Sequence, residues 1–308
     1  MLIIKSLHEL HGQFSNVSLA LGTFDGVHLA HRFVINRTVD WSSEHDGTSM
    51  VFTFANHPLS IINPQRVPPQ LQTIGGKTRQ IRKLGVQVLV RVPFTSSLLH
   101  LSPADFVHLL AVKIKPRHIV VGPNYSFGDK GAGTPEMLTG LAGRYGMEID
   151  ICPAVYENGI LVSSTAIRRL IAGGDMEKAA RLLGRVYDLS GTVIAGDHRG
   201  RTLGFPTANL NVAPRMLLPG KGVYAVKVKA GRKLFSGLCN IGINPTFAQD
   251  GLRIETHILD FDQDLYGKKI TLYFMGRLRV EKAFPSKTEL IAQLEQDVIQ
   301  ARNQYFNN

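Results

Sequence analysis

The chain changes its hydrophobic pattern near residue 185, and this change constrains the fold more than any other feature. Before it, apolar runs alternate with segments of helical spacing; the runs lie at 17–21, 50–54, 86–92 and 118–122, and the helical segments include 76–84 and 103–112. Such alternation predicts a parallel sheet wound with right-handed crossovers. After it, short β-branched runs follow one another between turns and end in a helical segment at 286–302, which is typical of an antiparallel barrel or sandwich. We therefore expect two domains, residues 1–185 and 186–308.

Composition narrows the range of partners. The chain carries 35 lysines and arginines against 24 aspartates and glutamates, a formal net charge of +11. Because this excess is spread evenly over both halves, and aromatic residues do not interleave with the basic ones, we expect no nucleic-acid partner. The two cysteines are too few for a disulfide framework or a zinc site, and no run of 18 apolar residues occurs. We expect a cytoplasmic protein with no membrane partner, monomeric or only weakly self-associating.

A loop at residues 199–210 has the composition of a phosphate site. Gly200 and Gly204 allow backbone N–H groups to approach an anion, and Pro206 stiffens the exit from the loop. Thr207 and Asn209 alternate along the strand expected next, so their oxygens point to one side, as a Mg-nucleotide site requires. An ordinary Gly-Pro turn capped by the asparagine remains the alternative.

A second candidate site follows the first buried run. Strand, glycine turn and helix occur there in the order that presents a helix N-terminus to phosphate. His28 and His31, three residues apart at the helix start, would share one face and donate hydrogen bonds to phosphate oxygens. The alternative is one capping histidine and one exposed histidine; a His-x-x-His metal site is less favoured, because no further ligand cluster lies nearby.

Two more segments carry candidate groups. Ser164 and Thr165 stand at a helix start with Arg168 one turn further, a pattern that suits a leaving pyrophosphate, although a plain cap with solvated arginines would look the same. In the second half, Glu255 and His257 lie on one side of an expected strand. A carboxylate there could take a proton from an attacking hydroxyl, or it could be a solvated strand residue; we interpret the histidine as structural.

Five sequence blocks resemble, in order, those of bacterial bifunctional riboflavin kinase/FAD synthetases. They are GTFDGVH at 22–28 with His31, SSTAIR at 163–168, GRTLGFPTAN at 200–209, NIGINPTF at 240–247 and LYGK at 265–268. The resemblance spans essentially the whole chain. It implies a Rossmann-like nucleotidyltransferase domain with a parallel sheet, followed by an antiparallel β-barrel kinase domain with a terminal helix.

For the second half, the resemblance implies phosphorylation of riboflavin by ATP, giving FMN and ADP. Thr207 and Asn209 would hold Mg²⁺ with ATP, and residues 200–206 would cover the phosphates. Glu255 would activate the 5′-hydroxyl of riboflavin, and Arg279 resembles the arginine on the flavin side.

For the first half, the resemblance implies adenylylation of FMN by a second ATP, giving FAD and pyrophosphate. The FMN phosphate is already anionic and needs no enzymic base. Positioning and charge neutralisation would come from His28, His31, Ser164, Thr165 and Arg168. The ATP contacts implied in addition are Gly22, Phe24 and Asn124.

This half also departs from the family pattern. Ala30 stands where the family has glycine, AN at 55–56 replaces the usual Asp-Pro, and NYSF at 124–127 stands where Asp-Phe-Arg-Phe is common. One methyl group in a tight pocket typically costs about 1 to 3 kcal/mol. Two alternatives therefore stay open: a riboflavin kinase with an inactive first domain, and a non-catalytic flavin- or RNA-binding regulator.

Overall fold

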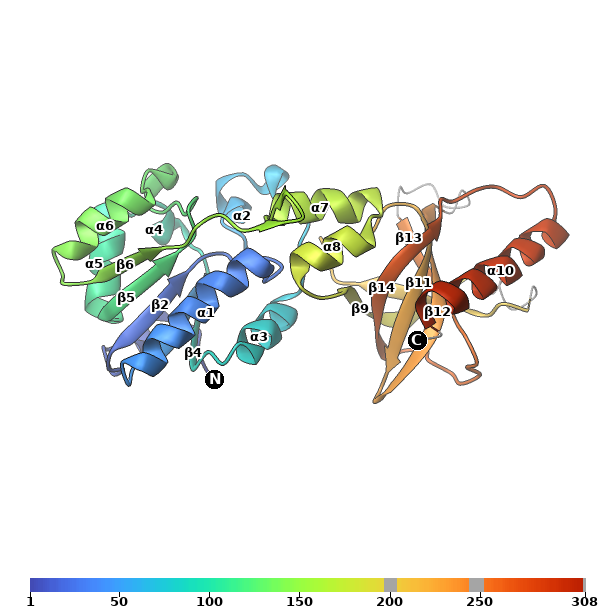
Figure 1. The fold of residues 1–308 in the computed structure, drawn as a ribbon, viewed down its shortest axis with the longest axis horizontal. Helices are drawn as coiled ribbons and strands as arrows, with labels where there is room; N and C mark the ends of the chain where they lie inside the picture. The colour runs from blue at the N-terminus through green and yellow to red at the C-terminus, as the bar shows by residue number, and fades with distance from the viewer. Residues whose placement is uncertain (197–203, 244–251, 307–308) are drawn as a thin grey trace. The chain divides into compact units, whose positions relative to one another are not determined.

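The computed structural model describes residues 1–196, 204–243 and 252–306. The chain forms two compact units (Figure 1). The first contains residues 1–68 and 73–164, and the second contains residues 69–72 together with the chain from Thr165 onward. Each unit is described by itself.

The first unit is built on a six-stranded, fully parallel sheet in the order β1-β4-β3-β2-β5-β6. The strands are β1 Leu2–Ile4, β2 Val17–Leu21, β3 Thr48–Phe54, β4 Val88–Val92, β5 Pro116–Val121 and β6 Glu148–Ile151. The predicted parallel sheet is confirmed, and its four central strands are those expected from the apolar runs. The sequence reasoning missed the edge strands β1 and β6. Both are short, and most of their side chains are only partly buried or exposed, so neither forms a long apolar run.

Helices cover both faces of this sheet. Alternate side chains of β2 point to opposite faces: Ala20 packs with α1 (Leu29–Glu44) and α3 (Ile74–Lys83), whereas Leu19 packs with α5 (Pro103–Lys113) and α6 (Pro135–Gly143). Smaller elements complete the unit: η1 Leu7–Glu9, α2 Leu59–Ile62, η2 Pro64–Arg66, α4 Ser96–Leu99, η3 Asp129–Gly131, β7 Tyr156–Glu157 and β8 Ile160–Leu161.

The second unit is a closed antiparallel barrel in the order β10-β13-β12-β11-β14-β9. Its strands are β9 Tyr187–Ile194, β10 Thr207–Val212, β11 Gly222–Ala230, β12 Lys233–Ile243, β13 Leu252–Ile258 and β14 Lys269–Arg279. Tyr187, Tyr224 and Phe274 are fully buried in it. The patterns expected for a barrel are confirmed; closure into a barrel rather than a sandwich removes every sheet edge.

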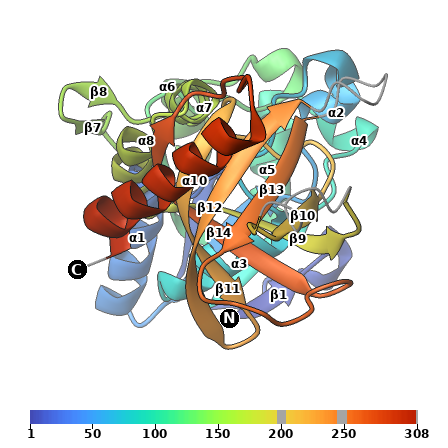
Figure 2. The ribbon, with the colours of Figure 1, turned by 90° about the vertical axis from the view of Figure 1, so that its right-hand side faces the viewer.

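Helices pack on the barrel at two places. Helix α7 spans Ser164–Gly173 and belongs to this unit from Thr165 onward. Helix α8 spans Met176–Leu183 and packs against β9 and β14. The terminal helix α10, Lys287–Ala301, and the turn η4, Arg302–Phe306, cover the outer side of β11, β12 and β14 (Figure 2). Val223, Ala225 and Leu238 form this apolar seam with Ala301.

The second unit also takes up a short segment from early in the chain. Gln70 pairs with Met216: its N–H donates to the carbonyl of Arg215 (2.7 Å), and its own carbonyl accepts from the N–H of Leu217 (2.9 Å). Leu71 beside it is fully buried. Residues 69–72 and 165–185 therefore belong to the second compact unit. The boundary expected between the two catalytic regions at 185/186 stays a prediction.

Candidate active sites

The loop after β2 lies at the point where the strand order of the parallel sheet reverses. From β2 the chain proceeds through β3 and β4 on one side, while β5 and β6 lie on the other. The turns after β2 and β5 therefore diverge at the carboxyl edge, which is where open α/β sheets bind nucleotides. Gly22 follows β2 directly, and the exposed Asn124 lies in the turn after β5. The topology brings these two predicted residues to one edge.

His28 and His31 form one stacked pair at the start of α1. His28 is the N-cap of the helix, and its Nδ1 accepts the backbone N–H of His31 (3.3 Å). The two rings stack with centroids 3.6 Å apart and planes 15° apart, and the ring of Phe24 meets His31 edge-on at 5.3 Å. Because Nδ1 of His28 accepts, the ring proton is on Nε2, which can donate to an anion. The capping alternative is therefore right for His28, but the two rings still share one face.

The turn before this helix has an unusual backbone. Phe24 and Val27 both have positive φ, at 49° and 41°, a region that a β-branched residue such as valine rarely adopts. Phe24 is fully buried, and a Cβ at Gly22 would come within 3.0 Å of its ring. The hydroxyl of Ser164 donates to the carbonyl of Asp25 in the same turn (2.9 Å). The structure thus gathers Gly22, Phe24, both histidines and Ser164 around one turn.

Thr165 and Arg168 follow in the first turns of α7 and belong to the second unit. Nε of Arg168 donates to the carbonyl of Pro69 (2.8 Å), in the short segment that the second unit takes up. Thr165 is exposed. Their roles toward a phosphate remain predictions. The contact of the arginine with Pro69 was not foreseen, because no pattern in the chain connects two segments so far apart.

One departure from the family pattern has a structural role. The side-chain amide of Asn56 donates to the hydroxyl of Ser60 (3.0 Å) and to the carbonyl of Phe94 (3.1 Å). Its oxygen accepts the backbone N–H of Phe94 at 2.7 Å. These bonds hold the turn after β3 against the turn after β4. Because the amide uses both its donor and its acceptor, the proline that is usual in the family at this position could form none of these three bonds.

The second candidate site lies on the outer face of the barrel. Along β13 the buried Ile254, Thr256 and Ile258 point inward, so Glu255 and His257 point outward. The register pairs Asn209 with Glu255 and Thr207 with His257, which places all four side chains on one face. Glu255 is also paired with Asn240 of β12. The result is a polar row across three strands, Asn209, Glu255 and Asn240. The sequence reasoning assigned no role to Asn240, because pairing between strands is invisible to it.

His257 holds the exit of the predicted phosphate loop. Its Nδ1 donates to the carbonyl of Pro206 (2.8 Å), and its ring meets Phe205 edge-on at 5.2 Å. The structural interpretation of this histidine is therefore right. Gly204 has φ of 82°, which glycine adopts freely. Gly200, the first part of the loop, and residues 244–247 of the fourth family block lie outside the described residues.

Thr207 and Asn209 offer oxygens that fit Mg²⁺. Magnesium prefers hard oxygen ligands and usually keeps several waters and substrate phosphates, so two neutral protein oxygens suffice. Asn209 is held close to Gly196, where any Cβ would overlap the Nδ2 atom of the amide. Over the described ranges, groups of three or more His, Cys, Asp or Glu side chains that could hold a metal by themselves are absent.

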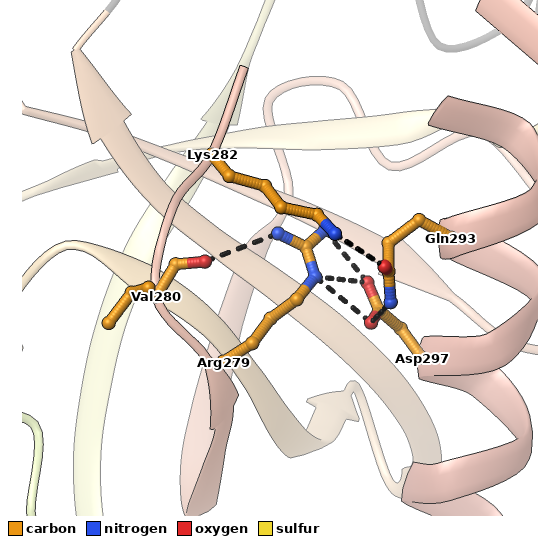
Figure 3. A network of polar contacts seen from close by, with 5 residues as sticks. All are labelled: Arg279, Val280, Lys282, Gln293 and Asp297. Atoms are coloured by element: carbon orange, nitrogen blue, oxygen red, sulfur yellow. Dashed lines mark hydrogen bonds and ion pairs between the residues drawn. The ribbon is translucent and has the colours of Figure 1, made fainter. Parts of the chain in front are cut away.

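Arg279 anchors the terminal helix. Its Nε contacts both carboxylate oxygens of Asp297 (3.0 Å each), and its Nη2 contacts Oδ2 at 2.9 Å (Figure 3). Nη1 donates to the carbonyl of Val280 (3.3 Å). The side chain of Asp297 is only 1% exposed, and it also accepts from Gln293. The guanidinium expected to bind flavin is therefore engaged in joining β14 to α10.

The two units are a helix-covered parallel sheet and a closed antiparallel barrel. Comparisons with known proteins specify the family: the family model for FAD synthetase matches residues 11–166, and that for riboflavin kinase matches residues 183–305. The chain is 38% identical over 309 residues to the bifunctional riboflavin kinase/FMN adenylyltransferase of Bacillus subtilis, over 98% of this chain and 96% of that protein. The protein of that description from Listeria monocytogenes is 40% identical over 285 residues, covering 92% and 90%. The chain therefore belongs to the family of bifunctional riboflavin kinase/FMN adenylyltransferases.

A solved structure is similar over the same length. It is described as a macrolide-efflux protein from Streptococcus pneumoniae, with a TM-score of 0.89 and 30% identity over 98% of each chain. In the part of the chain that the structure describes, helices with the length and apolar character needed to cross a membrane are absent.

Proposed function

We propose that this chain makes FMN from riboflavin and ATP, releasing ADP, and then makes FAD from FMN and a second ATP, releasing pyrophosphate. The family membership over both units supports the two activities. The observation that carries the proposal is the register of β10 and β13, which pairs the candidate base Glu255 with the candidate metal ligand Asn209.

In the kinase step, Glu255 would take the proton from the 5′-hydroxyl of riboflavin. The hydroxyl oxygen then bonds to the γ-phosphorus of ATP, the bond from that phosphorus to the β,γ-bridging oxygen breaks, and ADP leaves. Thr207 and Asn209 would hold Mg²⁺, which supplies positive charge to the phosphates. His257 contributes by fixing Pro206 at the loop exit.

In the adenylylation step, an FMN phosphate oxygen would attack the α-phosphorus of ATP, and pyrophosphate leaves with the bridging oxygen. The protein has to position two anions and to stabilise the charge that develops between them. The Nε2–H of His28 and the backbone N–H groups at the start of α1 are the donors suited to this. Ser164, Thr165 and Arg168 are proposed to hold the leaving pyrophosphate.

The test separates the two activities on one chain. Purified protein is incubated with ATP, Mg²⁺ and either riboflavin or FMN, and the flavins are separated by chromatography. Glu255→Gln should abolish FMN formation and leave FAD formation from added FMN intact, whereas His28→Ala with His31→Ala should do the reverse. Glu295→Gln, an exposed glutamate of α10, is the matched control and should keep both activities.

The outcomes distinguish the alternatives. If the unmodified chain accumulates FMN without FAD, the first unit is inactive, and Ala30 is the first residue to restore to glycine. If no flavin is converted and RNA binds in a salt-dependent way, the chain is a binding protein. Retained kinase activity in Glu255→Gln would remove this carboxylate as the base.

We also propose the setting in which these steps occur. Mg²⁺ at Thr207 and Asn209 predicts that EDTA stops the kinase step and that added Mg²⁺ restores it. Both cysteines are free thiols, as expected for a protein of the reducing cytoplasm. We propose a monomer or a weakly self-associating chain, which size-exclusion chromatography at several protein concentrations would test.

A further inference from the structure

Lys77 binds the turn that carries the predicted adenylylation residues. It lies near the start of α3, and its ammonium reaches the ends of β2 and β3. Nζ donates to the carbonyl of Thr23 (2.7 Å), to the carbonyl of Phe54 (3.3 Å) and to the hydroxyl of Thr53 (3.4 Å). A lysine ammonium has three N–H donors, and these three acceptors match them in number. The ammonium is therefore fully used within the protein.

The hydroxyl of Thr53 forms a second link between the ammonium of Lys77 and the carbonyl of Thr23. It is completely buried and donates to the carbonyl of Thr23 at 3.1 Å, so its oxygen is the acceptor toward Lys77. The carbonyl of Thr23 thus accepts two hydrogen bonds. The next residue, Phe24, is the first of the two non-glycine residues with positive φ in the turn that leads to His28. The bonds fix the chain at the point where its strained path begins.

Lys77 is half-buried, and its ammonium is held by neutral oxygens, which is uncommon for a lysine in a purely structural role. Burial lowers the pKa of Lys77 to about 8; the charge of Asp25 in the turn opposes this shift, and the charge of Arg91 on β4 adds to it. Arg91 itself donates to the hydroxyl of Thr78 on α3 (2.9 Å). Strongly perturbed groups near a ligand-binding edge are more common at functional sites than elsewhere.

We propose that Lys77 is a positioning residue for adenylyl transfer: its ammonium holds the carbonyls of Thr23 and Phe54, so that the turn at residues 22–28 keeps the shape that directs His28 and the start of α1 toward the phosphates. The inference rests on the proposed adenylylation. Because its donors are used within the protein, Lys77 acts through the turn rather than by touching substrate.

The first experiment compares Lys77→Met with Lys83→Met, an exposed lysine at the end of the same helix. For Lys77→Met we expect kcat for FAD formation from FMN to fall by about tenfold or more, with KM for FMN nearly unchanged, because the lost groups act in the transition state. Lys77→Arg, which keeps the charge, should recover part of the loss. Kinase activity of the same sample should stay unchanged in all three variants.

Two results would overturn the proposal. One is a Lys77→Met enzyme that matches Lys83→Met; the other is a raised KM with an unchanged kcat, which would mean direct contact with substrate. If the unmodified chain makes no FAD from FMN, the proposed function fails instead, so the two failures are distinguishable.

The second experiment needs no variant and covers the case in which Lys77→Met fails to fold. Deprotonation of Lys77 leaves two N–H donors for three acceptors, so adenylylation by the unmodified enzyme should decline above about pH 8. The fluorescence of Trp41, the only tryptophan, should not change over the same range, because the first unit stays folded. An adenylylation rate that stays flat through this range, or a decline that follows unfolding, would overturn the proposal.

Discussion

Breaking the pair between Arg279 and Asp297 should destabilise the barrel by several kcal/mol. Asp297 is almost completely buried, and three contacts of 2.9 to 3.0 Å join it to the guanidinium. Arg279→Met leaves the carboxylate with the single amide of Gln293 among the partners described, at 2.9 Å. Removing one partner of a buried ion pair costs about 3 to 5 kcal/mol, because the other charge stays buried without compensation. At a urea dependence of roughly 2 kcal/mol per molar, the midpoint should fall by about 1.5 to 2.5 M.

The assay has to report on the barrel alone, and the two cysteines allow this. Cys239 is fully buried in the barrel and Cys152 is buried in the first unit. Burial raises the pKa of the Cys239 thiol to about 12 and that of Cys152 to about 11, so neither reacts readily while folded. A short pulse of alkylating reagent at each urea concentration, read by mass spectrometry of the two peptides, gives one unfolding curve per unit.

For Arg279→Met we expect the unfolding curve from Cys239 to shift to lower urea concentration and the curve from Cys152 to stay unchanged. Replacing both partners, by Arg279→Met with Asp297→Leu, should recover much of the loss, since no charge is then left buried. If the Cys239 curve does not move and KM for riboflavin rises, the ion pair contributes little and the arginine belongs to the flavin site. That result would refute the structural reasoning.

Three further predictions concern other parts of the molecule. Gly196→Ala should lower kinase activity by about a hundredfold and spare adenylylation, because the new methyl group displaces the amide of Asn209; flavin chromatography measures both. Burial lowers the pKa of His118 from its usual 6.5, so the folded state binds fewer protons than the unfolded state. Stability of the first unit should therefore be full above about pH 6.5 and decrease below it, as urea midpoints from Trp41 fluorescence would show, and His118→Gln should flatten this dependence. Gly276→Ala should displace Tyr305, whose hydroxyl binds Glu177 (2.8 Å), and lower the Cys239 midpoint by the equivalent of roughly 1 to 3 kcal/mol.

The sequence predicted what depends on local periodicity. The five residues of β2 are all buried, as its four apolar residues indicate, and the alternation along β13 is enough by itself to place Glu255 and His257 on one face. Local periodicity could not predict contacts between residues that are far apart in the sequence. The proximity of Asn240 to Glu255 follows from strand register, and the bond from Arg168 to Pro69 joins residues 99 positions apart.

The sequence also could not predict how far a charged side chain is buried. Lys77 follows two glycines at the start of a helical segment, where a lysine is usually solvated. Only the close approach of the ends of β2 and β3 reveals its role. Arg279 illustrates the converse: the motif suggested a ligand contact, while the partner that engages it lies 18 residues further on, in a helix.

The passage of residues 69–72 through the second unit bears on how such a protein can be divided. A fragment that begins at Thr165 would lack these four residues, leaving the carbonyl of Arg215 and the N–H of Leu217 without the partners they have in the full chain. It would also lose the buried side chain of Leu71. No single cut in the polypeptide therefore yields both units intact. In this chain the two compact units are interleaved in sequence, so a truncation that removes the first unit also removes four residues of the second.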